Sequence, residues 1–537
     1  MSERVVEASE TQADAIPEGP DGPDGRRGLR GHPWLTLLTV AVGVMMVALD
    51  GTIVAIANPA IQTHLHASLA SIQWVTNGYL LALAVFLITA GKIGDRFGHR
   101  TTFLVGAVGF AAASAAIGFS SSIELVIAFR VLQGLFGALL QPAALGLLRA
   151  TFPSDKLNMA IGIWGGAIGV STAAGPIVGG LLVQHISWQS VFFVNVPVGL
   201  VTLGLGLWIL RDTRPEKSGQ SFDIPGIVLL SVAMFALVFG IIKAPAWGWG
   251  DARTLAFLGG AVLIAAAFTY WQTRSAHPLL PLSLFRSVSL SAGTVLMILM
   301  MFGFFGALFF VTFYLQNVRG MSPVSAGVHL LPMTAMLIVG SPIAGLLIGR
   351  IGPRVPIVGG MVCTAVAMFG MSALHTDTST GLLSLWFVLL GLGLSPVIVG
   401  ATEVIVGNAP VELAGVAGGL QQSAMQVGGT LGTAVLGAVM AAKVDSVLPG
   451  KWAAAKLPAI APQNYPGLKQ AVQVGVAPVP KGTPAAAAQA MTQVAHSSFL
   501  SGMSLAFTVA AVVALLAGAV GLFTRRGETE SGPAVHI

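Results

Sequence analysis

Long apolar stretches recur along almost the whole chain, about fourteen of them, each close to 20 residues long. A helix needs about 20 mostly apolar residues to cross the hydrocarbon core of a bilayer. Because lipid offers no hydrogen bonds, only helices and closed barrels can cross it. A barrel would require alternating segments of about ten residues, and the sequence lacks them. The pattern therefore predicts an all-α integral membrane protein.

The predicted spans take up most of the 537 residues, of which 55% are hydrophobic and only 9% are charged. This composition leaves no room for an additional soluble domain. The net charge of +6 is therefore attributed to membrane topology and not to nucleic-acid binding. The spans are expected at about 34–58, 72–92, 102–120, 123–148, 158–184, 191–210, 223–243, 253–272, 289–316, 324–348, 355–374, 381–406, 414–440 and 499–523.

The distribution of Lys and Arg sets the expected orientation. With the N-terminus in the cytoplasm, 18 of these residues fall in cytoplasmic segments and 8 in outer segments. This is the bias that the positive-inside rule describes. We therefore expect a bacterial inner-membrane protein with both termini cytoplasmic. Residues 1–33 are polar, lack the order of a signal peptide and are predicted to be disordered, and 524–537 form a short tail.

An internal repeat indicates two related halves. The segment Gly91–Arg100 recurs as Gly345–Arg354, with two Gly and two Arg at identical offsets. Repeated halves are the usual architecture of secondary transporters. The sequence therefore predicts a six-helix bundle over 34–212, two additional helices with linkers over 213–288, and a second six-helix bundle over 289–523. The outer loop 441–498 is rich in Ala and Pro and is expected to be mobile.

Two charged residues inside spans are the strongest functional signal. Asp50 is the only charge in its span, and a carboxylate at the bilayer centre costs about 2.5–3.5 kcal/mol even on the lenient insertion scale. Arg130 lies in the fourth span on the same helical face as Gln133. The alternatives for Arg130 are snorkelling outward and pairing with Glu124. An acid that takes up and releases a proton is what an ion-coupled transporter needs.

Motifs for other kinds of chemistry are missing from the sequence. It contains no Gly-x-x-x-x-Gly-Lys-Ser/Thr phosphate loop, no His-Glu-x-x-His and no Gly-x-Ser-x-Gly. The single cysteine, Cys363, rules out a disulfide within the chain. We expect no enzymatic activity, no metal site and no bound cofactor, with a proton gradient as the energy source.

The short basic loop after the second span carries the most specific motif. Asp95 is expected to cap the next helix or to pair with a nearby Arg, and a simple topology-setting role is an equally good explanation. The pattern resembles the signature loop of the major facilitator superfamily, and nearly the whole chain resembles its fourteen-helix drug:proton antiporters of the EmrB/QacA type. The resemblance implies a cytoplasmic latch formed by Gly91, Asp95, Arg96, Gly98 and Arg100.

Two further motifs are similar to those of that family. The resemblance links Arg130 to proton transfer together with Asp50. Span five contains a pattern that is typical of drug-efflux members and favours export, namely Gly175, Pro176, Gly179 and Gly180. Tight helix packing explains the same glycines equally well. The first span departs from the family pattern, since Ala55 replaces an Asn and Asn58 follows three residues later.

Several polar residues are candidates for contact with a substrate. They are Gln133, Glu403, Gln422 and Gln426. Bonding between helices is the commoner role of such amides, and Glu403 could instead reach the cytoplasmic interface. We expect a monomeric transporter that exports drugs, antibiotics or toxic amphipathic or cationic metabolites by alternating access. The alternative is a dedicated exporter of one endogenous metabolite, lipid or siderophore.

Overall fold

The structure is a computed structural model that describes residues 30–211, 223–276, 278–409, 414–458, 460–480 and 482–525. Within these ranges all regular secondary structure is helical. Fourteen helices or helix pairs are long and apolar enough to cross a membrane. The predicted fold class is confirmed. The expected disorder over 1–33 and the tail 524–537 lie almost entirely outside the described residues.

The first six spans form the N-terminal bundle, and two more spans follow. The bounds are α1 (Pro33–His64), α2 (Leu69–Phe97), α3 (His99–Gly118), α4 (Ile123–Thr151), α5 (Ser154–His185), α6 (Ser190–Phe193) with α7 (Asn195–Ile209), α8 (Ile224–Trp247) and α9 (Ala252–Arg274).

The last six spans form the C-terminal bundle. These spans are α10 (Val288–Phe313) with the π turn η2 (Tyr314–Val318), α11 (Pro323–His329) with α12 (Leu331–Ile351), α13 (Arg354–Ser372), α14 (Thr380–Gly407), α15 (Ala414–Ala454) and α17 (Ala485–Gly521). The short helices η1 (Leu282–Arg286), η4 (Pro462–Asn464) and α16 (Tyr465–Gln473) lie outside the spans.

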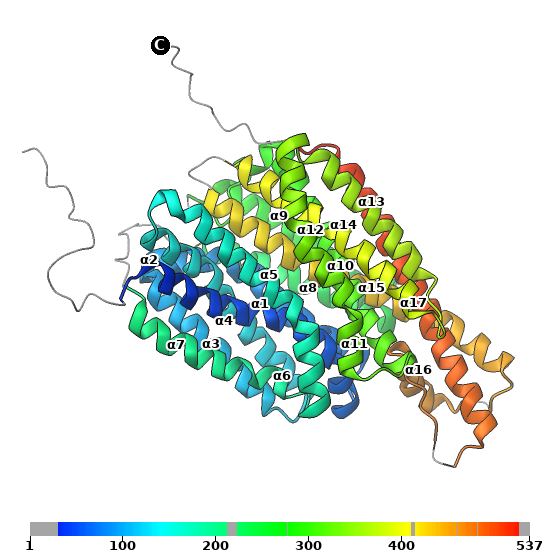
Figure 1. The fold of residues 1–537 in the computed structure, drawn as a ribbon. Coiled ribbons are helices and arrows are strands. Elements are labelled where there is room, and N and C mark those ends of the chain that lie inside the picture. The colour runs from blue at the N-terminus through cyan, green and yellow to red at the C-terminus, as the bar shows by residue number, and fades with distance from the viewer. Residues whose placement is uncertain are drawn as a thin grey trace, which may run out of the picture.

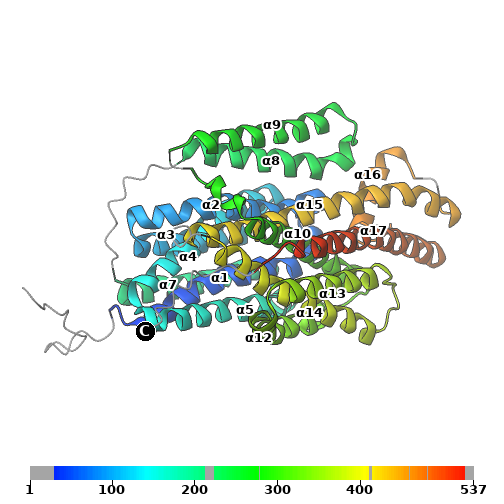
Figure 2. The same ribbon diagram turned by 90° about the horizontal axis from the view of Figure 1, so that it is seen from above.

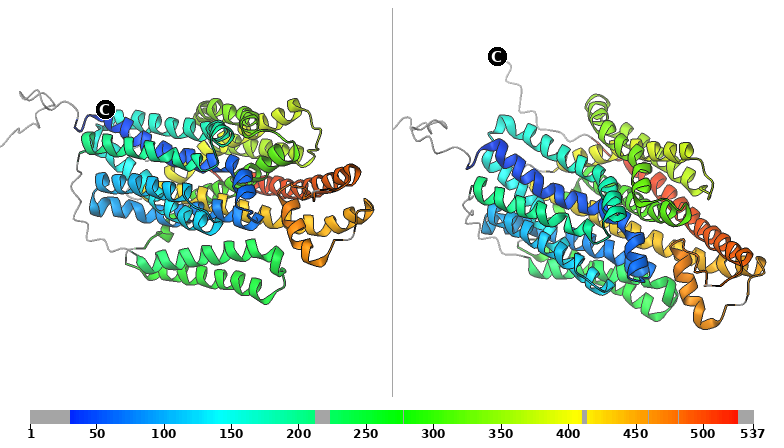
Figure 3. Two further views of the ribbon diagram at one scale, coloured as in Figure 1. Left: turned by 90° about the horizontal axis from the view of Figure 1, so that it is seen from below. Right: turned by 60° about the horizontal axis from the view of Figure 1, so that its bottom comes forward.

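The two bundles lie side by side, and the additional pair lies at the edge of the molecule. Figure 1 shows α1–α7 on one side and α10–α17 on the other. Figure 2 and the left view of Figure 3 show α8 and α9 as an outermost layer beside α2 and α15. The two helices that are central in the sequence are therefore peripheral in space.

A seam of hydrogen bonds joins the two bundles along α2 and α15. Gln73 Nε2 donates to the carbonyl oxygen of Thr433 over 2.7 Å, and Thr433 Oγ1 donates to Asn77. Further along, Ser423 Oγ donates to the carbonyl oxygen of Ala84 over 3.0 Å. The two helices are antiparallel along this seam, because rising numbers on α2 meet falling numbers on α15.

A second set of contacts closes the end of the molecule that lies away from the termini. Gln316 Nε2 donates to the carbonyl oxygen of Ile56 over 2.9 Å, which joins the end of α10 to α1. The backbone N–H of Val324 donates to Gln184 Oε1 over 3.2 Å, which joins α11 to α5. The bundles therefore touch at this end through helices that take no part in the seam.

The described part of 441–498 is largely helical, where the sequence suggested a mobile loop. α15 has 41 residues, about 60 Å at 1.5 Å per residue and roughly twice the hydrocarbon thickness. Figure 1 shows α15, α16 and α17 extending beyond the rest of the molecule. Lys451 Nζ donates to the carbonyl oxygen of Ser497 over 2.6 Å, and Lys469 pairs with Asp445. The Ala-rich composition explains the result, since Ala is the strongest helix former.

Asp223, the residue before α8, joins the start of α8 to the end of α9. The carboxylate caps α8 through the N–H of Gly226 at 3.0 Å. It also accepts hydrogen bonds from Trp271 Nε1 at 2.6 Å, Gln272 Nε2 at 2.7 Å and the N–H of Leu279 at 3.0 Å. Burial alone would raise the pKa of Asp223, but these four donors outweigh that effect and lower it below its usual value.

Candidate functional site

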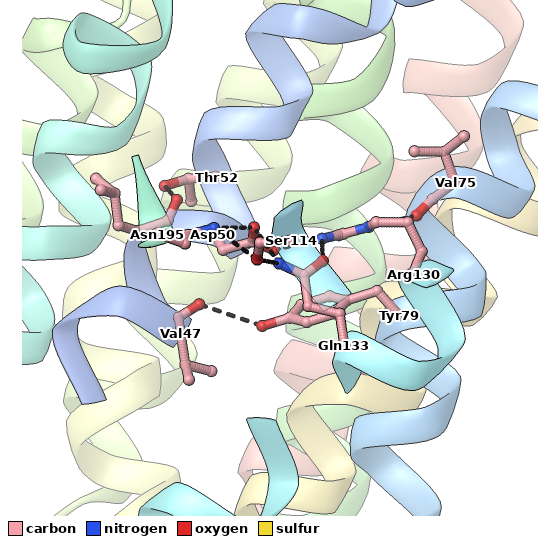
Figure 4. Close-up of polar contacts among 10 residues, drawn as sticks. Val47, Asp50, Thr52, Val75, Tyr79, Ser114, Arg130, Gln133 and Asn195 are labelled. Carbon is pink, nitrogen blue, oxygen red and sulfur yellow. Dashed lines mark hydrogen bonds and ion pairs between the residues drawn. The ribbon is translucent and has the colours of Figure 1, made fainter. Parts of the chain in front are cut away.

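The two intramembrane charges meet in the interior of the N-terminal bundle. Asp50 on α1 is fully buried, Arg130 on α4 is 2% exposed, and Arg130 Nη1 forms an ion pair with Asp50 Oδ2. Figure 4 shows this pair at the centre of a polar network. The structure therefore brings together the two residues that the sequence singled out. It rules out the alternatives, since Arg130 neither snorkels outward nor pairs with Glu124.

Two amides complete the hydrogen bonding of the carboxylate. Gln133 Nε2 on α4 donates to Asp50 Oδ1 over 2.9 Å, and Asn195 Nδ2 at the start of α7 donates to the same oxygen over 3.1 Å. Both amides also donate to Ser114 Oγ on α3, at 2.6 and 3.2 Å. Donors from two helices therefore stabilise the ionised form of Asp50, as Figure 4 illustrates.

Arg130 is held in place by four further contacts. Its Nε donates to the carbonyl oxygen of Val75 over 3.0 Å, and its Nη1 donates to Gln133 Oε1 over 2.6 Å. The guanidinium lies 4.0 Å from the ring centroid of Tyr79 and 5.8 Å from that of Phe192. Protonation of Asp50 would remove the counter-charge of Arg130 and weaken the contact between α1, α4 and α7.

A small cavity adjoins this network at the boundary between the two bundles. Its volume of about 10 Å³ is enough for roughly one water molecule. The lining residues from the N-terminal bundle include Gly51, Asn58, Thr76, Tyr79 and Arg130, and those from the C-terminal bundle are Phe305, Leu308, Phe309 and Thr433. The cavity therefore combines aromatic rings with the guanidinium of the ion pair.

Asn58 is the unusual residue of this cavity. Its side chain is 1% exposed, and neither amide atom has a hydrogen-bond partner among the described residues. Asn77 Nδ2 on α2 lacks a partner in the same part of the structure. Buried polar groups are paired in the large majority of cases, so each exception calls for an explanation such as a water or a ligand. Asn58, which follows three residues after the position where the family has an Asn, is therefore left with an unused amide donor and acceptor among the described residues.

The candidate substrate residues are dispersed. Gln133 belongs to the Asp50 network and does not line the small cavity. Gln422 Nε2 donates to Gln141 on α4 and so joins the two bundles. Gln426 is half-buried with an unpaired Oε1 among the described residues, and Glu403 is half-buried on α14. For Gln426 and Glu403, contact with a substrate therefore stays a prediction.

The signature loop is shorter than the sequence suggested. α2 continues to Phe97, so the backbone of Asp95 belongs to its last turn. Gly98 alone separates α2 from α3 and has a φ of 89°, a conformation that favours Gly. Arg100 Nη2 donates to the carbonyl oxygen of Leu207 on α7 over 3.1 Å, and Arg96 lies over the ring of Phe97. The Asp95 side chain lies outside the described residues, and Gly91 is half-buried.

The glycine motif of span five packs against both bundles. Gly175 and Gly179 face α1, where a Cβ on Gly179 would lie 2.9 Å from the carbonyl oxygen of Ile53. Gly180 faces α11, where a Cβ would lie 2.6 Å from the carbonyl oxygen of Pro323. Pro176 contacts Gly327 of α11. These glycines permit the close approach of helices that closes this end of the molecule.

Sequence reasoning did not identify three residues of the network, Asn195, Ser114 and Tyr79. An amide in an apolar span was the available signal for Asn195. Ser114 lies among alanines and carries no comparable signal. Tyr79 could be recognised only as one of four tyrosines in the chain.

Comparison with known proteins identifies the family. Residues 40–433 match the Major Facilitator Superfamily. The chain is 67% identical over 500 residues to a tetracenomycin C resistance and export protein of Streptomyces glaucescens, and the match covers 93% of each chain. It is 33% identical over 500 residues to the multidrug efflux pump LfrA of Mycolicibacterium smegmatis, covering 92% of this chain and 96% of that protein.

The structural comparison supports the same fold. The chain resembles a bacterial homologue of the human lysosomal transporter Spinster, crystallised in an inward-facing conformation, with a TM-score of 0.60 and 18% identity over 92% of this chain and 98% of that one. The family and the general function expected from the sequence, export of drugs and antibiotics across a membrane, are confirmed. The chain belongs to the Major Facilitator Superfamily, as a fourteen-helix multi-pass membrane protein of the drug-exporter type.

Proposed function

We propose that this chain exports tetracenomycin C or a closely related compound in exchange for protons. The observation that carries the substrate is the 67% identity, over 93% of both chains, to a tetracenomycin C resistance and export protein. Identity to the multidrug pump LfrA is half as high. The alternative considered from the sequence, a dedicated exporter of one metabolite, is therefore preferred over a pump of broad specificity.

The proton is exchanged at Asp50 in this proposal. In the deprotonated form, the carboxylate binds Arg130, Gln133 and Asn195 and holds α1, α4 and α7 together. In the protonated form, one oxygen becomes a donor and the ion pair with Arg130 is lost. Arg130 also lines the small cavity, so a molecule bound there acts on the ion pair directly. Binding and protonation can be coupled only if each favours a different conformation.

The described conformation represents one of the two end states of alternating access in this proposal. Both termini are cytoplasmic, as the distribution of Lys and Arg predicts. The contacts of α5 with α11 and of α1 with α10 then close the outer side. On the cytoplasmic half of α5, a Cβ at Gly165 or Gly169 would meet nothing within 4 Å. The transporter is therefore closed to the outside and can accept substrate from the cytoplasm.

The small cavity is the proposed substrate site in its contracted form. Phe305, Phe309 and Tyr79 offer aromatic surfaces to a polycyclic or aromatic molecule. The unpaired amide of Asn58 offers one donor and one acceptor, which suits a ketone or hydroxyl group. The substrate is held by apolar contact with one or two specific hydrogen bonds, as in most small-molecule sites.

Transport into everted membrane vesicles tests this proposal. The vesicles contain the wild-type chain and a pH-sensitive dye, are energised, and then receive tetracenomycin C. We expect release of protons from the lumen that is absent in Asp50→Asn vesicles. Ethidium and a set of unrelated drugs are tested in the same way, to show how many kinds of substrate the transporter accepts. A response to many drugs and none to tetracenomycin C would replace the dedicated exporter with a multidrug pump, and drug accumulation without proton release would contradict proton coupling.

A further inference from the structure

A second cavity lies outside the Asp50 site, between the N-terminal bundle and the additional helices. Its volume is about 610 Å³, within the range of small-molecule sites. α2 forms its floor, and α4 and α8 form its two walls. Figures 2 and 3 show that α8 and α9 lie at the perimeter of the molecule, which faces lipid in a membrane. The cavity is therefore a lipid-facing groove.

Each helix contributes one face to the groove. The wall residues of α8 are Ser231, Phe235, Phe239 and Lys243, spaced four apart and so aligned along the helix. The wall residues of α4 are Glu124, Ile127, Ala128 and Val131. The floor runs along α2 from Ser71 to Phe86, a distance of about 22 Å at 1.5 Å per residue. This length exceeds the roughly 15 Å depth of half a hydrocarbon core.

The lining is apolar apart from Ser71, Ser231 and two charged residues at one end. Trp74 packs against Phe235 and Phe239, with ring centroids 5.7 and 6.2 Å apart. Glu124, in the first turn of α4, and Lys243, near the end of α8, carry opposite charges at the same end of the groove. Among the described residues neither forms an ion pair, and the Lys243 ammonium lies 5.9 Å from the ring of Phe239.

We propose that this groove binds a phospholipid with a zwitterionic headgroup that contains a primary ammonium group. One acyl chain would lie along α2 between the aromatic side chains. The lipid ammonium would donate to the Glu124 carboxylate, and Lys243 would donate to the phosphate. Two charges of opposite sign at one end of an apolar groove, neither of them in an ion pair among the described residues, match the two charges of this headgroup in sign.

The charge pattern distinguishes this lipid from the other common ones. An anionic headgroup such as phosphatidylglycerol satisfies Lys243 but leaves Glu124 facing a like charge. A choline headgroup carries the positive charge but cannot donate a hydrogen bond. A bound lipid would also fill the space between α8 and the N-terminal bundle and so connect the peripheral helix pair to α2 and α4.

Native mass spectrometry of the purified full-length chain tests the proposal. The protein is delipidated and then offered phosphatidylethanolamine, phosphatidylcholine and phosphatidylglycerol with identical acyl chains. We expect phosphatidylethanolamine to be retained about tenfold better than the others, since its hydrogen bonds to charged groups are not available to them. Equal retention of the three lipids by the wild-type chain would overturn the proposal.

Three variants locate the binding. Glu124→Gln is expected to abolish the preference for phosphatidylethanolamine, and Lys243→Gln to weaken retention of all three phospholipids. Ala128→Phe fills the groove without changing a charge and should prevent retention, which keeps the test valid if a charge variant fails to fold. The matched control is Asp377→Asn, an exposed acid between α13 and α14, which should behave as wild type. A preference that survives both Glu124→Gln and Ala128→Phe would place the lipid elsewhere.

Discussion

Asn195 Nδ2 donates a hydrogen bond to Asp50 Oδ1 over 3.1 Å. This bond ties the sixth span to the first at the level of the buried carboxylate. Together with the ion pair from Arg130, it means that three spans of one bundle share a single acidic group. The second bundle contributes to the adjoining cavity but not to this network.

Replacement of Asp50 by Asn is expected to leave a folded, inserted protein that has lost gradient-driven transport, because the amide cannot exchange a proton. Arg130 is then a buried cation without its counter-charge, which lowers thermal stability. Since most of that cost comes from the unpaired partner, the double variant Asp50→Asn/Arg130→Gln should be more stable than the sum of the single effects predicts. The midpoint of thermal unfolding in detergent is measured for the wild-type chain, the two single variants and the double variant. Strict additivity would contradict the coupling.

Removal of the Asn195 amide is expected to reduce transport by about tenfold, the usual effect of a lost hydrogen bond to a charged group. The matched control lies in the same network. Ser114 accepts hydrogen bonds from Gln133 and Asn195, whereas the donors to Asp50 are Arg130, Gln133 and Asn195. Ser114→Ala should therefore change transport much less than Asn195→Ala, with initial rates in vesicles as the measurement. Equal effects of the two variants would show that general packing, and not the contact with Asp50, is responsible.

A methyl group at Gly180 is expected to weaken the closed arrangement of α5 and α11. A Cβ there would lie 2.6 Å from the carbonyl oxygen of Pro323, and overpacking of this kind costs about 1–3 kcal/mol. Gly165 lies on the same helix, and a Cβ added to it would have nothing within 4 Å, so Gly165→Ala is the control.

Cross-linking of two introduced cysteines by a thiol-reactive linker about 10 Å long reports this effect directly. The cysteines replace Gln184 and Val324, which are joined by the hydrogen bond from the Val324 N–H to Gln184 Oε1, in a Cys363→Ser background that contains no other thiol. Cross-linking should be efficient in this parent and with Gly165→Ala, and much slower with Gly180→Ala. An unchanged rate with Gly180→Ala would show that the glycine does not control the closed state.

The Asp223 carboxylate, which joins the start of α8 to the end of α9, makes the stability of the protein depend on pH. Its lowered pKa means that the ionised form stabilises the fold above about pH 4, and that this stabilisation is lost as the pH falls through the value in the folded protein. Asp223→Asn should lower the stability by about 1–3 kcal/mol at neutral pH and flatten its dependence below pH 5. Thermal unfolding across this range is the measurement. Asp251→Asn, which removes the solvent-accessible cap of α9, should have a smaller effect.

Most of the architecture could be predicted from the sequence because lipid restricts the choice so strongly. The number of spans follows from hydropathy, the division into six, two and six from the internal repeat, and the choice of Asp50 and Arg130 from the cost of buried charge. The link between Asp50 and Arg130 was implied by the family resemblance. Asn195 was not predicted, since an amide near a span end has several ordinary roles. The distance between a residue of the sixth span and one of the first depends on packing that no local pattern encodes.

The extension beyond α15 and the state of Asn58 were also beyond sequence reasoning, for different reasons. The segment 441–498 is rich in Ala and Pro, which suggested a mobile loop, but its alanines extend α15 and α17, which pack against each other. Asn58 stands three residues after the position at which the family has an Asn. In the structure its amide is buried without a hydrogen-bond partner among the described residues, which only three-dimensional packing can reveal.

The seam between α2 and α15 limits the movements available to the two bundles. Its bonds connect Gln73 with Thr433 at one end and Ala84 with Ser423 at the other. A sliding displacement would break all of them at once, whereas a rotation about the seam preserves them and separates helices away from it, among them α1 from α10 and α5 from α11. The seam thus favours a change in the angle between the two bundles over a change in their relative height.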